Sequence, residues 1–165
     1  ELAGLDTSPL VGHLAAWNYF MSSESDENDA FIEAWHEFIG DDNRVTNDPM
    51  EATVIGFNLW VKAVEIAGTT EVDVVRSPMY GLTVPNLTGG IAVMNTNHHL
   101  TKPVLIGEIL DDGQFEIVYE TLAGVIGDAW TDFLPDSSLL VADWTSPIKC
   151  GNYNIKTGVC SGQNY

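Results

Sequence analysis

Five residues in the first third of the chain carry side chains that could bind a small molecule. Trp17, Asn18 and Tyr19 follow a short apolar stretch, and Asp48 and Glu51 lie at the predicted start of a long helix. Trp and Tyr offer flat apolar faces, whereas Asn, Asp and Glu offer hydrogen-bond acceptors. Open α/β sheets bind their ligands at strand ends. We therefore predict ligand binding here, beside simpler alternatives: packing for the aromatic pair and helix capping for the acidic pair.

Signatures of catalysis and of metal binding are missing from the sequence. It contains no GxSxG, Walker, GxGxxG or HExxH motif. His98 and His99 are adjacent, and neighbours on a strand point to opposite faces, so both could not easily bind one metal. The acidic run at 25–29 lacks the glycine and terminal Glu of a calcium loop. We predict a non-enzymatic protein with no catalytic residue, no metal and no cofactor.

The two cysteines, Cys150 and Cys160, flank a polar segment near the end of the chain. Their spacing is too wide for a CxxC motif, and no nearby His completes a zinc set. We expect a disulfide that closes this loop and stabilises it by about 2–3 kcal/mol. A structural disulfide favours an extracytoplasmic compartment.

Composition limits the classes of partner. The 165 residues are 45% hydrophobic, which suits one globular domain or part of a larger one. Acidic residues number 24 against 6 Lys plus Arg, a net charge of −18. Such a surface repels phosphate, which argues against nucleic acid and anionic lipid as partners. The chain starts at Glu1, without an initiator Met or a signal peptide, so we expect a mature, processed or incomplete chain.

Helical patterns dominate the first half of the chain. Residues 10–20 predict a short apolar strand that runs into an aromatic turn. Apolar residues then recur at helical spacing over 30–39, and Gly40 ends that helix. A third pattern predicts a helix over 49–67 that ends at Gly68.

The start of the long helix resembles a capping box. Asp48 is the expected N-cap, with Pro49 at the first helical position and Glu51 at the third. The helix is apolar over most of its circumference, which predicts cover on both sides. Thr70 is the expected cap of a shorter helix, which Pro78 limits.

Strand patterns follow. LTGGIAVMN predicts a hairpin strand entered by a Gly-Gly turn, and PVLIGEILDDGQFEIVYE predicts two strands joined by Asp111-Asp112-Gly113. Beyond Glu120 no periodicity is clear. We predict an α/β portion over 1–120 and an irregular C-terminal extension over 121–165.

The order of these motifs resembles one protein family. GHLAAWNYF, RVTNDPMEA, FNLWVKAVEIAG, EVDVVR, NHHLTKPVLIGEI, DGQFEIVYET and LPDSSLLVADWTSP are similar to the C-terminal part of urea or short-chain-amide substrate-binding proteins of ABC importers. The resemblance covers roughly residues 4–150. It implies the C-terminal part of a two-lobed type I periplasmic-binding-protein fold, with a hinge, a late β-hairpin and an ABC permease as partner.

Three departures from that family stand out. Met94-Asn95-Thr96 replaces the family's Met-Asp-Pro before the paired histidines, and the two cysteines lie outside its pattern. The family is also much longer, and its N-terminal region supplies most of one lobe. We therefore expect either a fragment or a chain whose missing N-terminal half is a partner chain. The implied location is periplasmic or extracellular, with a membrane anchor in the missing N-terminus as an option.

The chemistry of the predicted site fits a small, polar, neutral ligand such as urea or a short amide. These molecules are rich in N–H donors, which need acceptors and flat apolar walls. Arg44 is the only cation expected near Trp17 or Glu51, which weakens an amino-acid ligand without removing it.

Three alternatives to a solute-binding protein stay open. An amide sensor of the same fold would be cytoplasmic and lack a disulfide, and an amide-processing enzyme would release ammonia. A structural or surface-assembly protein that retains the fold would show repeating subunit contacts and no closed cleft.

Overall fold

The computed structural model describes residues 2–121, 123–128, 130 and 133, together with the backbone of residues 153–154 and 159–160. The chain divides into two compact units, Glu1–Asp128 and Ala129–Tyr165. All the sites discussed below lie in the first unit. The second unit contains one described antiparallel pair, β7 (Tyr153–Asn154) and β8 (Val159–Cys160). Our predicted boundary after residue 120 stays a prediction.

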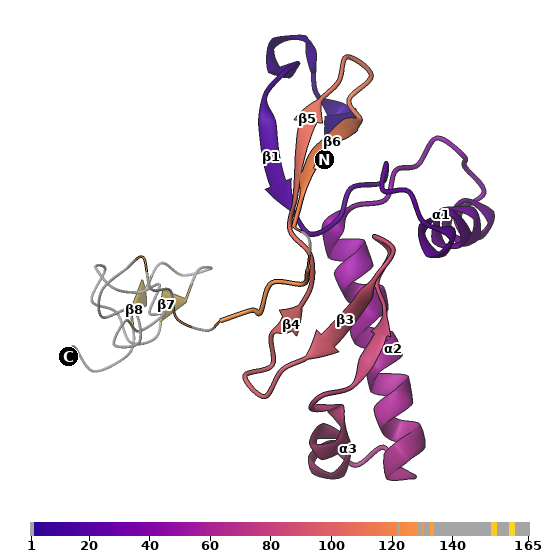
Figure 1. Cartoon of the computed structure of the whole chain (residues 1–165), viewed down its shortest axis with the longest axis vertical. Helices are drawn as coiled ribbons and strands as arrows, with labels where there is room; N and C mark the ends of the chain where they lie inside the picture. The colour runs from indigo at the N-terminus through magenta and orange to yellow at the C-terminus, as the bar shows by residue number, and fades with distance from the viewer. Residues whose placement is uncertain are drawn as a thin grey trace. The chain divides into compact units, whose positions relative to one another are not determined.

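In the first unit, three consecutive α-helices follow one short strand, and five further strands come after them (Figure 1). Its elements, in chain order, are η1 (Leu2–Gly4), η2 (Ser8–Leu10), β1 (Leu14–Trp17), α1 (Asp26–Ile39), α2 (Asp48–Ala67), α3 (Val72–Met79), β2 (Thr83–Pro85), β3 (Ile91–Met94), β4 (Leu100–Thr101), β5 (Leu105–Ile109) and β6 (Phe115–Glu120). This mixture agrees with the predicted α/β class, including the late hairpin β5–β6.

One three-stranded antiparallel sheet has the order β1-β5-β6. The register pairs Trp17 with Leu105, so the end of β1 lies beside the start of β5. The register of β5 against β6 shifts between Ile106 and Gly107. Phe20 packs its ring so closely against that glycine that a Cβ on Gly107 would lie 2.8 Å from the ring. The absence of a side chain there lets the aromatic ring cover the sheet.

A second three-stranded sheet, β2-β3-β4, packs on α2 (Figure 1). The hairpin β2–β3 turns through residues 86–90, as the Gly-Gly signal predicted. The core between this sheet and the helix consists of the buried residues Ile55, Leu59, Val84 and Ala92. Isoleucine and leucine at helical spacing thus meet valine and alanine from adjacent strands.

Both predicted long helices are present with their C-terminal glycines. Gly40 ends α1 and Gly68 ends α2, each with a positive φ, and each backbone N–H bonds a carbonyl of the last turn. This left-handed conformation is the one glycine adopts most readily. The helix α1 begins earlier than its apolar pattern suggested, because the Ser25 hydroxyl caps it by accepting from the Asn28 N–H.

The expected cap of the third helix is wrong, and the described residues cover only one side of the long helix, so cover on its other side stays a prediction. Thr70 does not cap α3: its N-cap is Glu71, without a side-chain capping bond, and Pro78 lies inside the helix. The long helix is not covered on both sides within the described residues. One face of α2 is buried, whereas Phe57 and Trp60 on another face are 61% and 41% exposed. We call this exposed apolar surface of Phe57 and Trp60 the α2 stripe, and it is flanked by the half-buried Val54, Val61 and Val64.

Three chain segments connect the β1-β5-β6 sheet with the part of the unit that contains α2 (Figure 1). They are residue 18, residues 102–104 and residue 121, and we call them the crossing. Hydrogen bonds join them side by side: Asn18 Nδ2 donates to Pro103 O at 2.6 Å, and Thr121 N donates to Val104 O at 3.1 Å. The Thr121 hydroxyl in turn accepts from the Val104 N–H at 3.0 Å.

Candidate functional site

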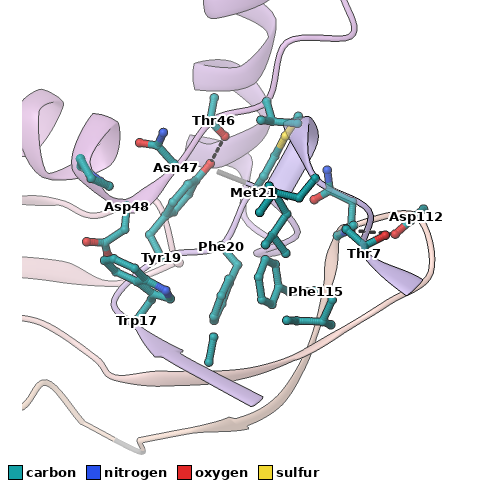
Figure 2. Close-up of a pocket in the computed structure, with 18 residues that line it drawn as sticks. Thr7, Trp17, Tyr19, Phe20, Met21, Thr46, Asn47, Asp48, Asp112 and Phe115 are labelled. Atoms are coloured by element: carbon teal, nitrogen blue, oxygen red, sulfur yellow. Dashed lines mark hydrogen bonds between the residues drawn. The ribbon is translucent and has the colours of Figure 1, made fainter. Parts of the chain in front are cut away.

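A cavity of about 340 Å³ opens where the end of β1 meets the start of α2 and the β5–β6 turn (Figure 2). Its volume falls within the range of small-molecule sites. The residues that line it come from segments far apart in the sequence: Leu2, Leu5, Thr7, Ala15, Trp17, Tyr19, Phe20, Met21, Val45, Thr46, Asn47, Asp48, Pro49, Ile109, Asp112, Gly113, Gln114 and Phe115. Three of the five residues predicted to bind ligand are among them, and Asn18 and Glu51 are not.

Aromatic side chains form one wall of the cavity. Trp17 ends β1 and remains 41% exposed, so its indole is available to a ligand. Phe20 is buried, and its ring centroid lies 4.5 Å from that of Phe115 in the opposing strand β6. The pairing of β1 with β5 and of β5 with β6 brings these rings together. The wall therefore offers a flat apolar surface, to which Phe20 and Phe115 contribute beside the predicted Trp17.

The Tyr19 hydroxyl is occupied by the protein itself. Tyr19 is 1% exposed, and its hydroxyl donates to Asn28 Oδ1 at 2.7 Å and lies 2.6 Å from Thr46 Oγ1. Burial raises the pKa of Tyr19 to about 12, and the hydrogen bond with Thr46 offsets only part of that shift. The ring of Tyr19 lines the cavity, whereas its polar group holds α1 against the segment before α2 (Figure 2).

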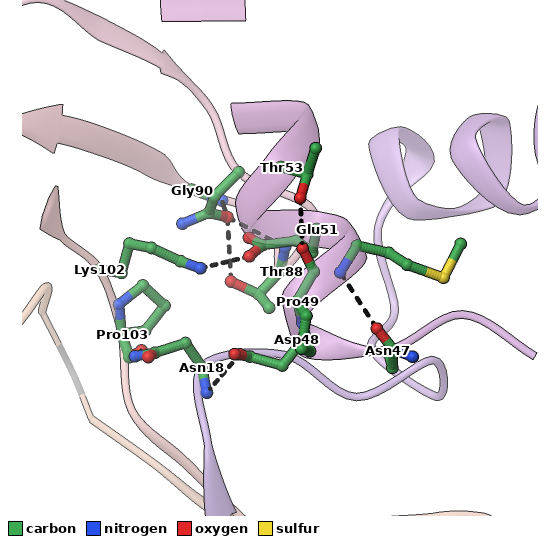
Figure 3. Close-up of polar contacts among 12 residues, drawn as sticks. Asn18, Asn47, Asp48, Pro49, Glu51, Thr53, Thr88, Gly90, Lys102 and Pro103 are labelled. Atoms are coloured by element: carbon green, nitrogen blue, oxygen red, sulfur yellow. Dashed lines mark hydrogen bonds and ion pairs between the residues drawn. The ribbon is translucent and has the colours of Figure 1, made fainter. Parts of the chain in front are cut away.

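The start of α2 differs from the predicted capping box. Asn47, not Asp48, is the N-cap, and its side chain accepts from the Met50 N–H at 3.0 Å. Asp48 is the first helical residue, and its Oδ1 accepts from the Asn18 N–H at 3.0 Å. Asn18 does not line the cavity, and its side-chain amide donates to Pro103 O. Its contribution is thus to tie the end of β1 to the helix that carries Asp48 (Figure 3).

Glu51 neither caps the helix nor faces the cavity. It is fully buried and forms an ion pair with Lys102, which is 6% exposed (Figure 3). Burial raises the pKa of the Glu51 carboxyl, and the hydrogen bond and charge of Lys102 lower it less strongly. The expectation that Arg44 would be the only nearby cation is therefore wrong. Lys102 was missed because it is 51 residues away in sequence, although a lone lysine between two strands is a usable signal.

The charges around the cavity are of one sign. Asp48 and Asp112 line it, and the lining contains no Lys, Arg or His among the described residues. Asp112 Oδ1 accepts from the Gln114 N–H at 2.9 Å, within the hairpin turn. Each carboxylate keeps acceptor capacity beyond its one protein bond, because an ionised carboxylate has about four lone-pair sites. Asp112 was predicted only as a turn residue, so its place in the cavity wall is new.

The histidines lie elsewhere. Tyr80 Oη lies 2.7 Å from His98 Nε2, and the two rings meet edge to face. Within the described part of the chain, no group of three His, Cys, Asp or Glu side chains could hold a metal ion.

No described helix has the length and hydropathy needed to cross a membrane. The side chains of Cys150 and Cys160 lie outside the described residues, so their disulfide stays a prediction.

Comparisons with known proteins agree on a family. A family model described as a periplasmic binding protein domain matches residues 1–136. A solute-binding protein of an ABC transporter from Rhodopseudomonas palustris HaA2, solved with p-hydroxybenzoic acid, is 22% identical with a TM-score of 0.61. An amino acid ABC transporter substrate-binding protein from Pseudomonas fluorescens Pf-5 is 18% identical, also with a TM-score of 0.61. These likenesses confirm the type I periplasmic-binding-protein fold expected from the sequence.

The chain spans only part of each similar protein. It covers 33% of the R. palustris structure and 34% of the P. fluorescens structure, which match 72% and 76% of this chain. A Geobacillus stearothermophilus protein named limonene hydroxylase is 31% identical over 111 residues, which are 67% of this chain and 20% of that protein. A match to one fifth of a protein does not transfer its named activity.

Proposed function

The chain belongs to the periplasmic binding protein domain family, and from this membership we propose that it forms one wall of the ligand site of a solute-binding protein. That protein would capture its ligand outside the cytoplasm and deliver it to an ABC permease, without chemical conversion. The observation that carries the proposal is the cavity, which is lined by the exposed indole of Trp17 and by the carboxylates of Asp48 and Asp112.

We propose urea or a short-chain amide as the ligand. The supporting observation is the sign of the lining charges, since Asp48 and Asp112 accept hydrogen bonds but cannot donate them when ionised. Buried N–H groups of an amide need such acceptors, and an unpaired one costs about 1–3 kcal/mol. The indole of Trp17 and the ring of Tyr19 suit a planar molecule.

Ligands with a carboxylate are less suited to this wall. The R. palustris neighbours were solved with p-hydroxybenzoic acid and benzoate, and the P. fluorescens neighbour is named for amino acids. A carboxylate would meet Asp48 and Asp112, and like charges repel. Lys102 offers no compensation, because it is buried and paired with Glu51. Binding of a carboxylate would require cations from chain outside the described residues.

We also propose an occupant for the α2 stripe, namely the remaining part of the same solute-binding protein. Phe57 and Trp60 stack with ring centroids 6.0 Å apart on the exposed side of α2. Apolar patches of this kind mark interaction surfaces. The similar structures are about three times as long as the matched region, so most of such a protein lies beyond this chain.

Calorimetry tests the ligand class on the native-length protein, by which we mean this chain together with the remaining part of the proposed solute-binding protein. We expect binding of urea or acetamide and no binding of benzoate or leucine. Asp48→Ala should weaken amide binding by about tenfold, the effect of losing 1.4 kcal/mol. Asp111→Ala is the matched control, because Asp111 adjoins Asp112 but does not line the cavity. Binding of benzoate or leucine in place of the amides would overturn the proposed ligand class.

A further inference from the structure

Two hydrogen-bonded links join the first turn of α2 to the crossing (Figure 3). In one link, Asp48 Oδ1 accepts from the Asn18 N–H, and Asn18 Nδ2 donates to Pro103 O. In the other, Glu51 pairs with Lys102, the residue that precedes Pro103. The two links lie close together in sequence at both ends. Asp48 and Glu51 are three residues apart on the helix, and Lys102 and Pro103 are adjacent in the crossing. They close a circuit through three segments of the chain.

The members of this circuit differ in burial. Glu51 is fully buried and Lys102 nearly so, whereas Asn18 and Asp48 are half-buried beside the cavity. A buried ion pair contributes little net stability, since desolvation of both charges offsets their attraction. It does impose a position, because either charge alone in that site would be strongly unfavourable. The register of α2 against residues 102–104 is therefore restricted to the one in which the charges meet.

We propose that Glu51 and Lys102 are a positioning pair for the ligand site. Their contact holds the first turn of α2 against the crossing, and this placement lets Asp48 receive the Asn18 N–H and face the cavity. Trp17 precedes Asn18, so the same contact places the indole at the end of β1. Neither Glu51 nor Lys102 lines the cavity, so both act through these neighbours. The effect of this pair on ligand binding rests on the proposed function, whereas the contacts of Glu51 and Lys102 do not depend on it.

Amide exchange at Asn18 tests the pair without a ligand. In the native-length protein, we expect Lys102→Met and Glu51→Gln each to speed exchange of the Asn18 N–H by about tenfold or more, because a lone buried charge drives its surroundings apart. Amides of the β5–β6 ladder should exchange as in wild type. Arg76→Met is the matched control, because it breaks an exposed pair with Asp73 in α3.

The double variant Glu51→Gln with Lys102→Met separates positioning from mere stability. It leaves no lone charge, so global stability should recover relative to the single variants. Protection of the Asn18 amide should stay low, because nothing then fixes the register of the helix start. Lys102→Arg keeps the positive charge, so the Asn18 amide should be better protected in this variant than in Lys102→Met. Asn18 protection equal to wild type in the double variant would overturn the proposal.

Ligand binding provides the second measurement. We expect the double variant to bind acetamide and urea about tenfold more weakly than wild type, with stability accounted for separately. If wild-type protein binds neither probe, the proposed ligand class fails, and the exchange experiment still decides the positioning pair. If wild type binds the probes and the double variant binds them equally well, the pair does not position the site.

Discussion

At the scale of single residues, the cavity wall combines groups with different duties. Trp17 exposes its indole, whereas Tyr19 uses its hydroxyl within the protein. We expect Tyr19→Phe to lower the free energy of unfolding by about 1–3 kcal/mol, because Asn28 and Thr46 lose a buried partner. The ring remains, so the affinity for an amide ligand should change little. Denaturant titration and calorimetry measure the two quantities.

The control for that substitution is Tyr119→Phe. Tyr119 is 55% exposed in β6, and the loss of an exposed hydroxyl should change stability by less than about 0.5 kcal/mol. A large loss of affinity in Tyr19→Phe, with stability unchanged, would assign the hydroxyl to the ligand instead.

The buried carboxyl of Glu51 gives a second prediction, about how the free energy of unfolding changes with pH. Its pKa is raised from the usual 4.5 by burial, so the folded protein holds the proton more tightly than the unfolded chain does. Its contribution to stability is therefore fully present below pH 4.5 and is lost as pH rises through the raised pKa. We expect the double variant Glu51→Gln with Lys102→Met to lack this decline. Its free energy of unfolding should gain on that of wild type as pH rises.

Denaturant titrations at a series of pH values measure that difference. Two curves that stay parallel from about pH 4 to about pH 7 would show that folding leaves the pKa of Glu51 unchanged.

At the scale of elements, the sequence predicted the types of the main helices and the late hairpin. Apolar spacing and glycine ends are local signals, and α1, α2 and β5–β6 follow them closely. The cap of α2 was misplaced by one residue, because Asn47 and Asp48 are both favourable caps and Pro49 is tolerated at either of the first two helical positions. Local propensity alone could not choose between them.

The candidate site was less predictable, because it depends on contacts between distant segments. Trp17 and Asp48 were found through residue type and position, and both line the cavity. Glu51 was placed correctly on the helix, but its rotation toward Lys102 depends on where the segment after β4 lies. Asp112 looked like a turn residue and is one, yet the register of β5 and β6 also brings it to the cavity.

Packing between elements gives a third prediction, at Gly107. A Cβ there would lie 2.8 Å from the Phe20 ring, closer than real Cβ contacts, and 3.1 Å from Phe115 Cβ, tighter than most of them. We expect Gly107→Ala to destabilise the native-length protein by roughly 1–3 kcal/mol, the usual cost of overpacking. Gly4→Ala is the control, because a Cβ on Gly4 would have no atom of the described chain within 4 Å. Equal stability of the two variants would show that Phe20 can move aside freely.

At the scale of the whole molecule, the α2 stripe has no cover among the described residues. We expect residues 1–165, expressed alone, to self-associate or to lack protected amides in α2, because the exposed rings of Phe57 and Trp60 remain in water. Sedimentation and amide exchange measure these properties. Phe57→Ser with Trp60→Ser should reduce the association. A monomer with cooperative unfolding would mean that the chain needs no further cover.

The net charge gives a further whole-molecule prediction. A charge of −18 on 165 residues repels itself, and dissolved ions screen that repulsion. We expect the melting temperature to rise as NaCl increases from a few millimolar to about 0.15 M, where the screening length is about 8 Å. Scanning calorimetry measures the change. A melting temperature that stays constant or falls over this range contradicts the prediction.

Because Lys102 is buried, the rate of its chemical modification can report on a local opening of the structure. The sequence contains four lysines, Lys62, Lys102, Lys149 and Lys156. Reagents that acylate amines should modify the exposed Lys62 quickly, whereas Lys102 can react only when the contact with Glu51 opens. The rate at which Lys102 is labelled therefore reports how often the crossing separates from α2. A bound ligand that holds these segments together should lengthen the interval between openings, which mass spectrometry can follow over time.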